Sequence, residues 1–369
     1  MNQLFRWDQM GLFLLALAAG ILPFAVPEVC AAALREGLAL CSGSLLLSLF
    51  PFLVVSRLLV QCPESDLLAL PFRLAAWGIG IRTPCAARVL CIGFLGGFAP
   101  AASAAAQAVR TGQLTAEEAD ALLPACICSG PSFVVLTVGQ SLLGSAELGV
   151  LLFASQITAN YLTAALLNRF AGVHSVEQES AAQASPAPPR LDEILADAAI
   201  TYCKLCGFIL FFRLLAAGAG ALLPTGAGTL CAILLEVCSG CDLASRTGQW
   251  GSLLCCAALS VQGLSVLLQV RTICPPEMTL RPLYRARMLH LPLSLALFYL
   301  LLPGGEADVF STLPARVLLM RRVPPDCALL VFAVCCMAAC TLRSGIRQVE
   351  QKQMARNAGG CCINSKTLL

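Results

Sequence analysis

Residues 93–133 read GFLGGFAPAASAAAQAVRTGQLTAEEADALLPACICSGPSF, a sequence that is unusual for a membrane-spanning segment. Two apolar segments rich in Gly, Pro and Ser flank one polar turn from Arg110 to Asp120. Gly96-Gly97, Pro100 and Ser129-Gly130-Pro131 should interrupt any helix that forms here. Interrupted backbone is tolerated at membrane depth only inside protein or beside a water-filled cavity, so paired interruptions predict a transporter binding site. The alternative is that small residues simply let ordinary helices pack closely.

The composition indicates a helical membrane protein. Of the 369 residues, 58% are hydrophobic and 12% are charged, and the mean hydropathy is +0.81. Soluble domains normally contain about a quarter charged residues. Apolar runs long enough to span a bilayer recur along most of the chain, so we predict an all-α, polytopic membrane protein. Its arginines are scattered at helix ends rather than gathered in a patch, and no nucleic-acid-binding module is visible.

The 21 cysteines do not predict a metal site. Most lie singly or in pairs within apolar runs, where cysteine behaves as a small hydrophobic residue. Cys203-x-x-Cys206 and Cys238-x-x-Cys241 each supply half of a metal motif, but neither has a second half with a histidine nearby. We therefore expect no metal, no cofactor and no catalytic residue. So many thiols also argue against prolonged exposure to an oxidising compartment.

The order of apolar and polar segments predicts the organisation of the chain. In order, we expect a retained N-terminal transmembrane helix (1–30), a first repeat (31–170), a flexible linker (171–190), a second repeat (191–302), a C-terminal transmembrane segment (303–343) and a polar tail (344–369). The linker includes the polar, proline-rich sequence SVEQESAAQASPAPPR. We expect an arginine-rich loop at 281–287, and the arginines of this loop and of the tail argue that both segments are cytoplasmic.

Within the first repeat we expect spans at Ala39–Val60 and Gly149–Leu167. The segment Leu67–Ile81 is shorter, and we expect it at the membrane interface or re-entering the membrane. Thr115, followed by Glu117 and Glu118, fits an N-cap with acids in the first helical turn.

A weak internal repeat follows the linker. LFPFLVVSRLL at 49–59 aligns without gaps on LCGFILFFRLL at 205–215. Two further pairs follow in the same order, at 93–100 with 233–240 and at 130–132 with 263–265. Such a duplication, with broken helices in both copies, is expected of secondary transporters, and we predict that the two copies are inverted in the membrane.

Glu236 is the most informative single residue of the second half. It lies in the apolar segment LCAILLEVCSGC (230–241), just before Ser239-Gly240, which should open the helix. An acid at bilayer depth costs about 3 kcal/mol, so it needs a partner or a cavity. We interpret it as part of a substrate or proton site. The alternative is an acid at a helix end that reaches the interface, helped by Asp242.

A polar stripe follows this acid. Gln262, Ser265 and Gln269 are spaced by three and four residues, which places them on one helical face. They fit a solute site, and hydrogen bonding between neighbouring helices fits them equally well.

These motifs resemble those of the YlbJ-like sporulation integral membrane proteins, which contain paired nucleoside-recognition gate domains. The resemblance extends over about residues 31–302. The family's first motif is approximately S-G-Y-P-x-G-A, followed by a Glu-Glu-Ala helix and N-N-S-G-P. Matches lie at Gly97, Glu117-Glu118-Ala119, Ser129-Gly130-Pro131, Leu234-Leu235-Glu236, Gly263-Leu264-Ser265 and Gln269-Val270. Departures are Gly96 for Ser, a proline displaced to Pro100, Ile127-Cys128 for the Asn pair and Gln262 for Gly.

The resemblance implies a multi-pass transporter in the cell membrane, related more distantly to concentrative nucleoside transporters. For this family it implies export of dipicolinic acid from the mother cell toward the forespore, across the mother-cell or outer forespore membrane. The expected partners are a small anionic or nucleoside-like solute and the lipid bilayer, with no nucleic acid; homo-oligomerisation is left open. The expected solute-binding residues are Gly97, Ser129, Gly130, Pro131, Ser132, Glu236, Ser239, Gly240, Gln262, Ser265 and Gln269.

Two other classes of function stay open at this point. A membrane scaffold for spore envelope assembly would need no solute site. An intramembrane serine hydrolase would use the short pattern Gly130-Pro131-Ser132-Phe133 with His290, which requires the serine and histidine to meet in space.

Overall fold

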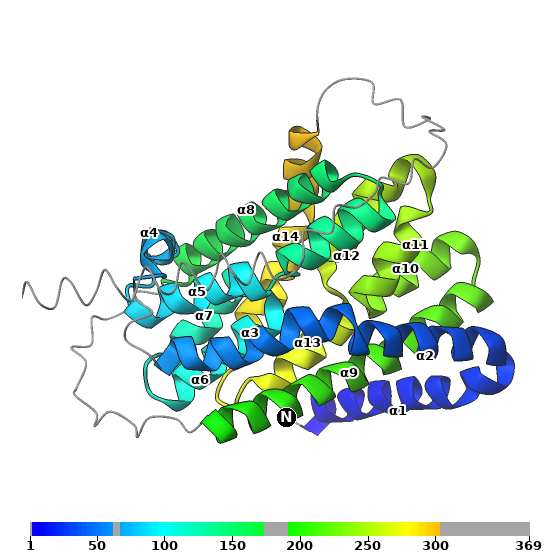
Figure 1. Cartoon of the computed structure of the whole chain (residues 1–369), viewed down its shortest axis with the longest axis horizontal. Helices are drawn as coiled ribbons and strands as arrows, with labels where there is room; N and C mark the ends of the chain where they lie inside the picture. Colours follow the sequence, from blue (N-terminus) through cyan, green and yellow to red (C-terminus); the bar gives the residue numbers. More distant parts are fainter. Residues whose placement is uncertain (1, 62–66, 173–190, 303–369) are drawn as a thin grey trace, which may run out of the picture.

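The computed structural model describes residues 2–61, 67–172 and 191–302, and every regular element among them is helical (Figure 1). The first half contains α1 (Asn2–Ala25), α2 (Pro27–Ser42), α3 (Ser44–Gln61), α4 (Leu70–Gly78), α5 (Pro84–Gly96), α6 (Phe98–Arg110), α7 (Ala116–Cys126), the π-helix η2 (Ser132–Leu142) and α8 (Ala146–Ala171). The second half contains α9 (Leu191–Leu222), α10 (Thr225–Leu235), α11 (Val237–Ser245), the 3-10 turn η3 (Gly248–Trp250), α12 (Gly251–Val261), α13 (Gly263–Ile273) and α14 (Arg281–Leu301). The predicted all-helical class is confirmed for these residues.

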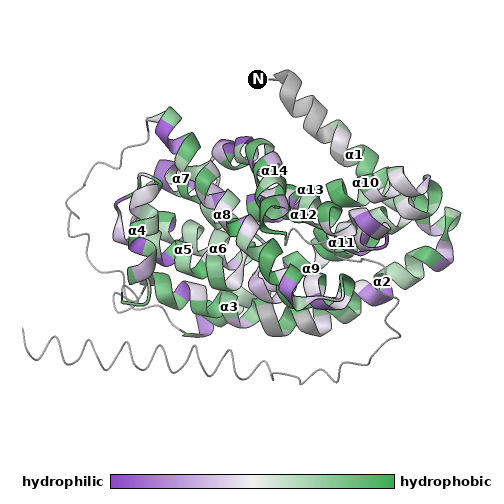
Figure 2. Cartoon of the chain, turned by 90° about the horizontal axis from the view of Figure 1, so that it is seen from above, coloured by the Kyte–Doolittle hydropathy of each residue, from purple (hydrophilic) through white to green (hydrophobic). Residues whose placement is uncertain are grey.

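The long helices identify a membrane-embedded protein. α8, α9 and the stretch Gly248–Ile273 are each long and apolar enough to cross a bilayer. Phe13–Ala25 and Pro27–Ser42, bent by 114° relative to each other, together make a fourth candidate. Hydrophobic residues occur along most of the helices (Figure 2), and large side chains such as Leu162 on α8 stay exposed, as contact with lipid requires.

The first helices differ from the expected spans. The segment predicted as one span at Ala39–Val60 belongs to two helices, α2 and α3, which meet at Gly43. α2 begins at Pro27, a residue favoured in the first turn of a helix, so the predicted boundary between 30 and 31 falls within this helix. α4 is a short helix within the segment Leu67–Ile81, and α8 is uninterrupted, as expected for Gly149–Leu167.

Each half contains a helical hairpin with its tip inside the protein. α5 and α6 meet at Gly97 and pack against each other. The start of α5 lies beside the end of α6, because Arg88 Nη2 donates to Gln113 Oε1 at 3.1 Å. α10 and α11 meet at Glu236 in the same way. A Cβ on Gly240 would lie only 2.8 Å from the Cα of Ile233, so the two arms of this second hairpin almost touch near its tip.

Each half also contains an interrupted helix that follows the hairpin. α7 ends at Cys126, and the chain becomes helical again at Ser132, the start of η2. α12 ends at Val261, and α13 starts at Gly263. Gln262 between them has φ of 65°, in the left-handed region that non-glycine residues rarely adopt.

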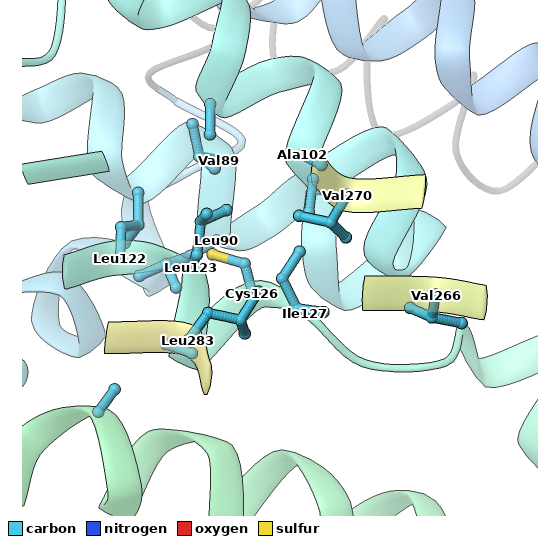
Figure 3. Close-up of a cluster of buried hydrophobic side chains, with 14 of the residues drawn as sticks. Val89, Leu90, Ala102, Leu122, Leu123, Cys126, Ile127, Val266, Val270 and Leu283 are labelled. Carbon is cyan, nitrogen blue, oxygen red and sulfur yellow. The ribbon is translucent and has the colours of Figure 1, made fainter. Parts of the chain in front are cut away.

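The core packs these short helices together. α3 and α2 contact α9, α8 contacts α14 and η2, and α13 contacts α6. Figure 3 shows the centre of the main apolar cluster, where Leu123 of α7 and Val270 of α13 lie close to the interruption at Ile127. The halves are therefore interleaved rather than separate.

Polar contacts fix the ends of α7 and α14. The predicted N-cap at Thr115 is confirmed, because its hydroxyl accepts from Glu118 N and the Glu118 carboxylate accepts from Thr115 N. Asp120, also on α7, accepts from Thr279 N at 2.8 Å and from Leu280 N at 3.1 Å. These two bonds hold the segment before α14 against α7. The predicted linker from residue 173 onward, the C-terminal segment at 303–343 and the tail at 344–369 lie outside the described residues.

Candidate functional site

The candidate site forms where the four interruptions of the helices meet. A Cβ on Gly97 would lie 2.7 Å from Gly130 N, so the tip of the first hairpin touches the interruption between α7 and η2. A Cβ on Gly263 would lie 2.9 Å from Glu236 N, so the tip of the second hairpin touches the interruption between α12 and α13. The same contact therefore occurs once in each half.

The two halves join at this level. Gln262 Nε2 donates to Ser129 Oγ at 3.4 Å, and this bond connects the interrupted helix of one half to that of the other. A pocket of about 70 Å³ lies at the junction. Its polar lining comes from both halves and consists of Ser129, Ser132, Glu236 and Gln269. We call it the solute pocket.

Four helices begin at the solute pocket. α6, η2, α11 and α13 all start at an interruption, so their first backbone N–H groups and the positive ends of their dipoles lie at this level. α6, η2 and α13 have no side-chain cap among the described residues. Unpaired N–H groups at a helix start favour a negatively charged ligand group.

Glu236 caps the fourth of these helices. Its Oε1 accepts from Cys238 N at 2.8 Å and its Oε2 accepts from Ser239 N at 2.7 Å. The side chain belongs to a residue only 2% exposed that lines the solute pocket. The alternative of an acid reaching the interface therefore does not match the structure, and Asp242 instead pairs with Arg246 on the surface of α11.

The second hairpin opens three residues earlier than predicted. Ser239 and Gly240 were expected to break the helix, but both are helical residues of α11. The break is at Glu236 itself, with φ of −153° and ψ of 126°. The reason is the capping bond, because an N-cap residue adopts extended backbone when its side chain accepts from the N–H groups that follow it. Gly240 serves the close packing of the hairpin arms.

Several predicted site residues carry buried polar atoms without a partner among the described residues. These atoms are Ser239 Oγ, Gln262 Oε1 and Gln269 Oε1. Gln269 Nε2 donates to Ser265 Oγ at 2.9 Å within α13, and the polar stripe is thus buried as a unit. Of these three residues only Gln269 lines the solute pocket. An unpaired buried acceptor is costly, so Gln269 Oε1 favours a site that a ligand or water completes.

The interruption between α7 and η2 forms one wall of the solute pocket. Ser129, Gly130 and Ser132 line the solute pocket, and Pro131 precedes η2 as its N-cap residue. Ile127, which stands where the resembled family has Asn, is fully buried. Its carbonyl oxygen accepts from Asn160 Nδ2 at 3.4 Å.

Arg287 was not among the expected site residues. The arginine-rich loop expected at 281–287 is instead the start of α14, and its last arginine lies behind the site. This residue of α14 is 8% exposed. Its Nη1 donates to Ser260 O at 3.3 Å and its Nη2 donates to Ile127 O, at the ends of α12 and α7 respectively. A cation at helix C-termini is favourable, and it satisfies carbonyl groups that the interruptions release.

The region behind the interruptions is polar, and His290 contacts α8 there. Gln156 of α8 donates to Ser260 Oγ at 3.0 Å, and His290 Nε2 lies 3.2 Å from Gln156 O. Ser132, the serine that a hydrolase would need, is an exposed residue lining the solute pocket. Among residues 2–61, 67–172 and 191–302, no hydrogen bond joins it to His290, and no group of three or more metal-ligating side chains occurs.

The contact between hairpin tips and interruptions gives a prediction about Gly97. Gly97→Ala should lower the thermal unfolding temperature in detergent strongly, because φ is +80° and the new Cβ would meet Gly130 N. Gly144→Ala is the matched control, since its φ is +72° and a Cβ there meets nothing within 4 Å. Gly130→Ala should be mild, because its Cβ would lie 3.5 Å from Gly96 O. Equal unfolding temperatures for Gly97→Ala and Gly144→Ala would contradict this contact.

A second prediction concerns Arg287. Arg287→Met should cost about 2 to 3 kcal/mol of unfolding free energy, because two buried carbonyl groups lose a charged donor. Arg287→Lys should be intermediate, since one ammonium group cannot reach both helix ends. Arg285→Met, at an exposed position of the same helix, is the control. A variant Arg287→Met that unfolds at the temperature of the unmodified protein would show that this bridge contributes nothing.

Comparison with protein-family models, with curated proteins and with solved structures finds no match. The YlbJ-like family expected from the motifs therefore stays a prediction.

Proposed function

We propose that the protein is a secondary transporter that moves a small solute through the solute pocket. The observation that carries this proposal is the meeting of four helix interruptions, two from each half, at one buried pocket. Non-helical backbone at membrane depth needs protein or water around it, and transporters use such interruptions to bind solutes near the membrane midplane. A membrane protein with a purely structural role would not need four helix interruptions at one pocket.

An inverted repeat is part of this proposal. The outer end of α6 and the start of α9 lie together, because Arg110 and Asp197 line one pocket. α9 is 32 residues long, about 48 Å. The second hairpin begins with α10 at the far end of α9. The first hairpin has its outer ends at the start of α9. Hairpins that reach a common pocket from opposite ends support inversion.

The aligned arginines support the same arrangement. Arg57 pairs with Asp197, whereas Arg213 pairs with Glu36 at 2.7 Å. Positions 197 and 213 are about 24 Å apart along α9 at 1.5 Å per residue. Each arginine thus meets an acid at a different depth of the helix bundle. This is the pattern that an inverted pair of copies of the LFPFLVVSRLL segment would give.

The chemistry of the pocket favours a solute with an anionic group. Three helix starts without side-chain caps offer N–H donors to an anionic group. The unpaired Oε1 of Gln269 in the pocket wall offers an acceptor to a donor group on the same solute. Glu236 suits a hydroxyl, a coupled proton or a cation on the same solute or beside it. A dicarboxylate or a nucleoside-like molecule fits these groups better than an uncharged apolar one.

The motifs identify the most specific candidate. By its resemblance to YlbJ-like proteins, we propose that the protein exports dipicolinic acid from the mother cell toward the forespore. It would then work as a multi-pass protein of the mother-cell or outer forespore membrane. A non-transporting scaffold would leave the buried unpaired polar atoms without a purpose, so we rank it second.

Glu236→Gln tests this proposal in proteoliposomes with radiolabelled dipicolinate and, separately, uridine. Transport should fall at least about tenfold, because the variant removes the only acid that lines the pocket within the described residues. Stability should fall by about 1 kcal/mol, since glutamine presents one acceptor where the glutamate presents two.

Thr115→Ala is the matched control for the loss of a helix cap. It should cost a similar amount of stability, because Thr115 caps α7 at an exposed position, and transport per folded protein should stay unchanged. Full transport by Glu236→Gln would remove Glu236 from the site. Failure of the unmodified protein to move either solute would favour the scaffold.

A further inference from the structure

A second pocket, of about 150 Å³, shares no lining residue with the solute pocket. It lies between the outer parts of four helices. Its polar walls are Arg57 on α3, Ser103 and Arg110 on α6, and Asp197 and Lys204 on α9. Thr201 on α9 and Thr272, in the last turn of α13, complete them. We call this pocket the basic vestibule.

The inner wall of the basic vestibule carries unpaired donors. Arg57 is 9% exposed and pairs through Nη1 with the Asp197 carboxylate, but its Nε has no partner among the described residues. Ser103 is 3% exposed, and its Oγ has no partner there either. A buried guanidinium with a free N–H is an expensive arrangement unless something accepts from it.

The rim adds further positive charge. Arg110 and Lys204 are exposed residues, so the vestibule is open to water on that side. Among the described residues, Arg57, Arg110 and Lys204 line the vestibule together with one carboxylate, that of Asp197, which leaves an excess of positive charge there. One water needs about 10–15 Å³, so the vestibule has room for a small polyatomic ion.

We propose that the basic vestibule binds the carboxylate or phosphate group of a small free solute. The Nε–H of Arg57 and the hydroxyl of Ser103 donate to the oxyanion from the inner wall. Arg110 and Lys204 hold it from the rim by charge. Planar guanidinium groups match carboxylate and phosphate geometry, and charge-assisted hydrogen bonds are about twice as strong as neutral ones.

The position of the vestibule gives this site a role, and that role rests on the proposed transport function. One apolar cluster has members in the walls of both pockets, with Leu49 and Phe98 at the solute pocket and Leu205 and Ile273 at the vestibule. The cluster separates the two sites in this structure. An anion bound in the vestibule would wait outside this apolar barrier until the helices rearrange.

The charge distribution assigns a side to the vestibule. Thr272 in its wall is close in sequence to the arginine-rich start of α14, and this segment is expected to be cytoplasmic. The vestibule would therefore recruit anions from the cytoplasm, which is the direction that an exporter requires.

Lys204 reports on the proposed anion directly. The chain has only three lysines, and the other two, Lys352 and Lys366, lie in the C-terminal tail sequence. The full chain in neutral detergent is treated with an amine-reactive succinimidyl ester, and labelling is followed peptide by peptide by mass spectrometry. Potassium phosphate and sodium acetate are compared with sodium chloride at equal ionic strength, which keeps general screening constant.

Phosphate and acetate should slow the labelling of Lys204 about fivefold relative to chloride, while Lys352 should label at an unchanged rate. Arg110→Gln should weaken the apparent affinity for phosphate about tenfold, because one of the rim charges is lost. Arg246→Gln is the matched control. Arg246 is an exposed arginine paired with Asp242 and does not line the vestibule, so this variant should keep full protection.

Equal labelling of Lys204 in phosphate, acetate and chloride would overturn the proposal. A lipid headgroup is tested with phosphatidylglycerol and phosphatidylcholine vesicles. Protection by phosphatidylglycerol alone, with no further effect of phosphate, would also overturn it. The two proposals fail separately, because protection of Lys204 together with normal transport by Glu236→Gln would leave the anion site standing and remove Glu236 from the solute pocket.

Discussion

Backbone N–H and C=O groups released at an interrupted helix must find partners inside the protein, because hydrocarbon offers none. This chain releases them at four places and brings the four places together. Gly97 touches Gly130, and Gly263 touches Glu236, at distances that leave no room for a side chain. The close approach of backbone to backbone explains why the interruptions are rich in glycine. The remaining groups are satisfied by side chains or are left open at the solute pocket.

The two buried charges at this level complement the helix dipoles. Glu236 accepts hydrogen bonds at the start of α11, and Arg287 donates to carbonyl groups at the ends of α7 and α12. Each charge thus sits at the helix end that stabilises it. Arg287 occupies the ends where helices stop, so a ligand meets mainly the ends where helices start. This asymmetry supports the proposal of a solute with an anionic group, and it also explains how an acid and an arginine can be buried without forming an ion pair with each other.

Much of the fold could be predicted from local sequence. Interruptions at Gly97 and at Ser129-Gly130-Pro131 follow from residue types that break helices, and the capping box at Thr115 follows from its spacing. The left-handed backbone of Gln262 could not be predicted, because nothing in a glutamine indicates it. The break at Glu236 was placed three residues late, since its cause is a side-chain bond rather than glycine. Arg287 and the basic vestibule depend on contacts between distant segments, which no local pattern contains.

We propose that a water-accessible ligand pocket, rather than packed protein or lipid, lies where the interruptions meet. Ser132→Cys and Leu162→Cys test it with a charged, membrane-impermeant methanethiosulfonate, with modification read by mass spectrometry in intact vesicles. Ser132 lines the solute pocket, whereas Leu162 is 48% exposed on the long apolar helix α8. The account predicts rapid modification at position 132 and almost none at 162. Equal modification at both positions, or a faster reaction at 162, would contradict it.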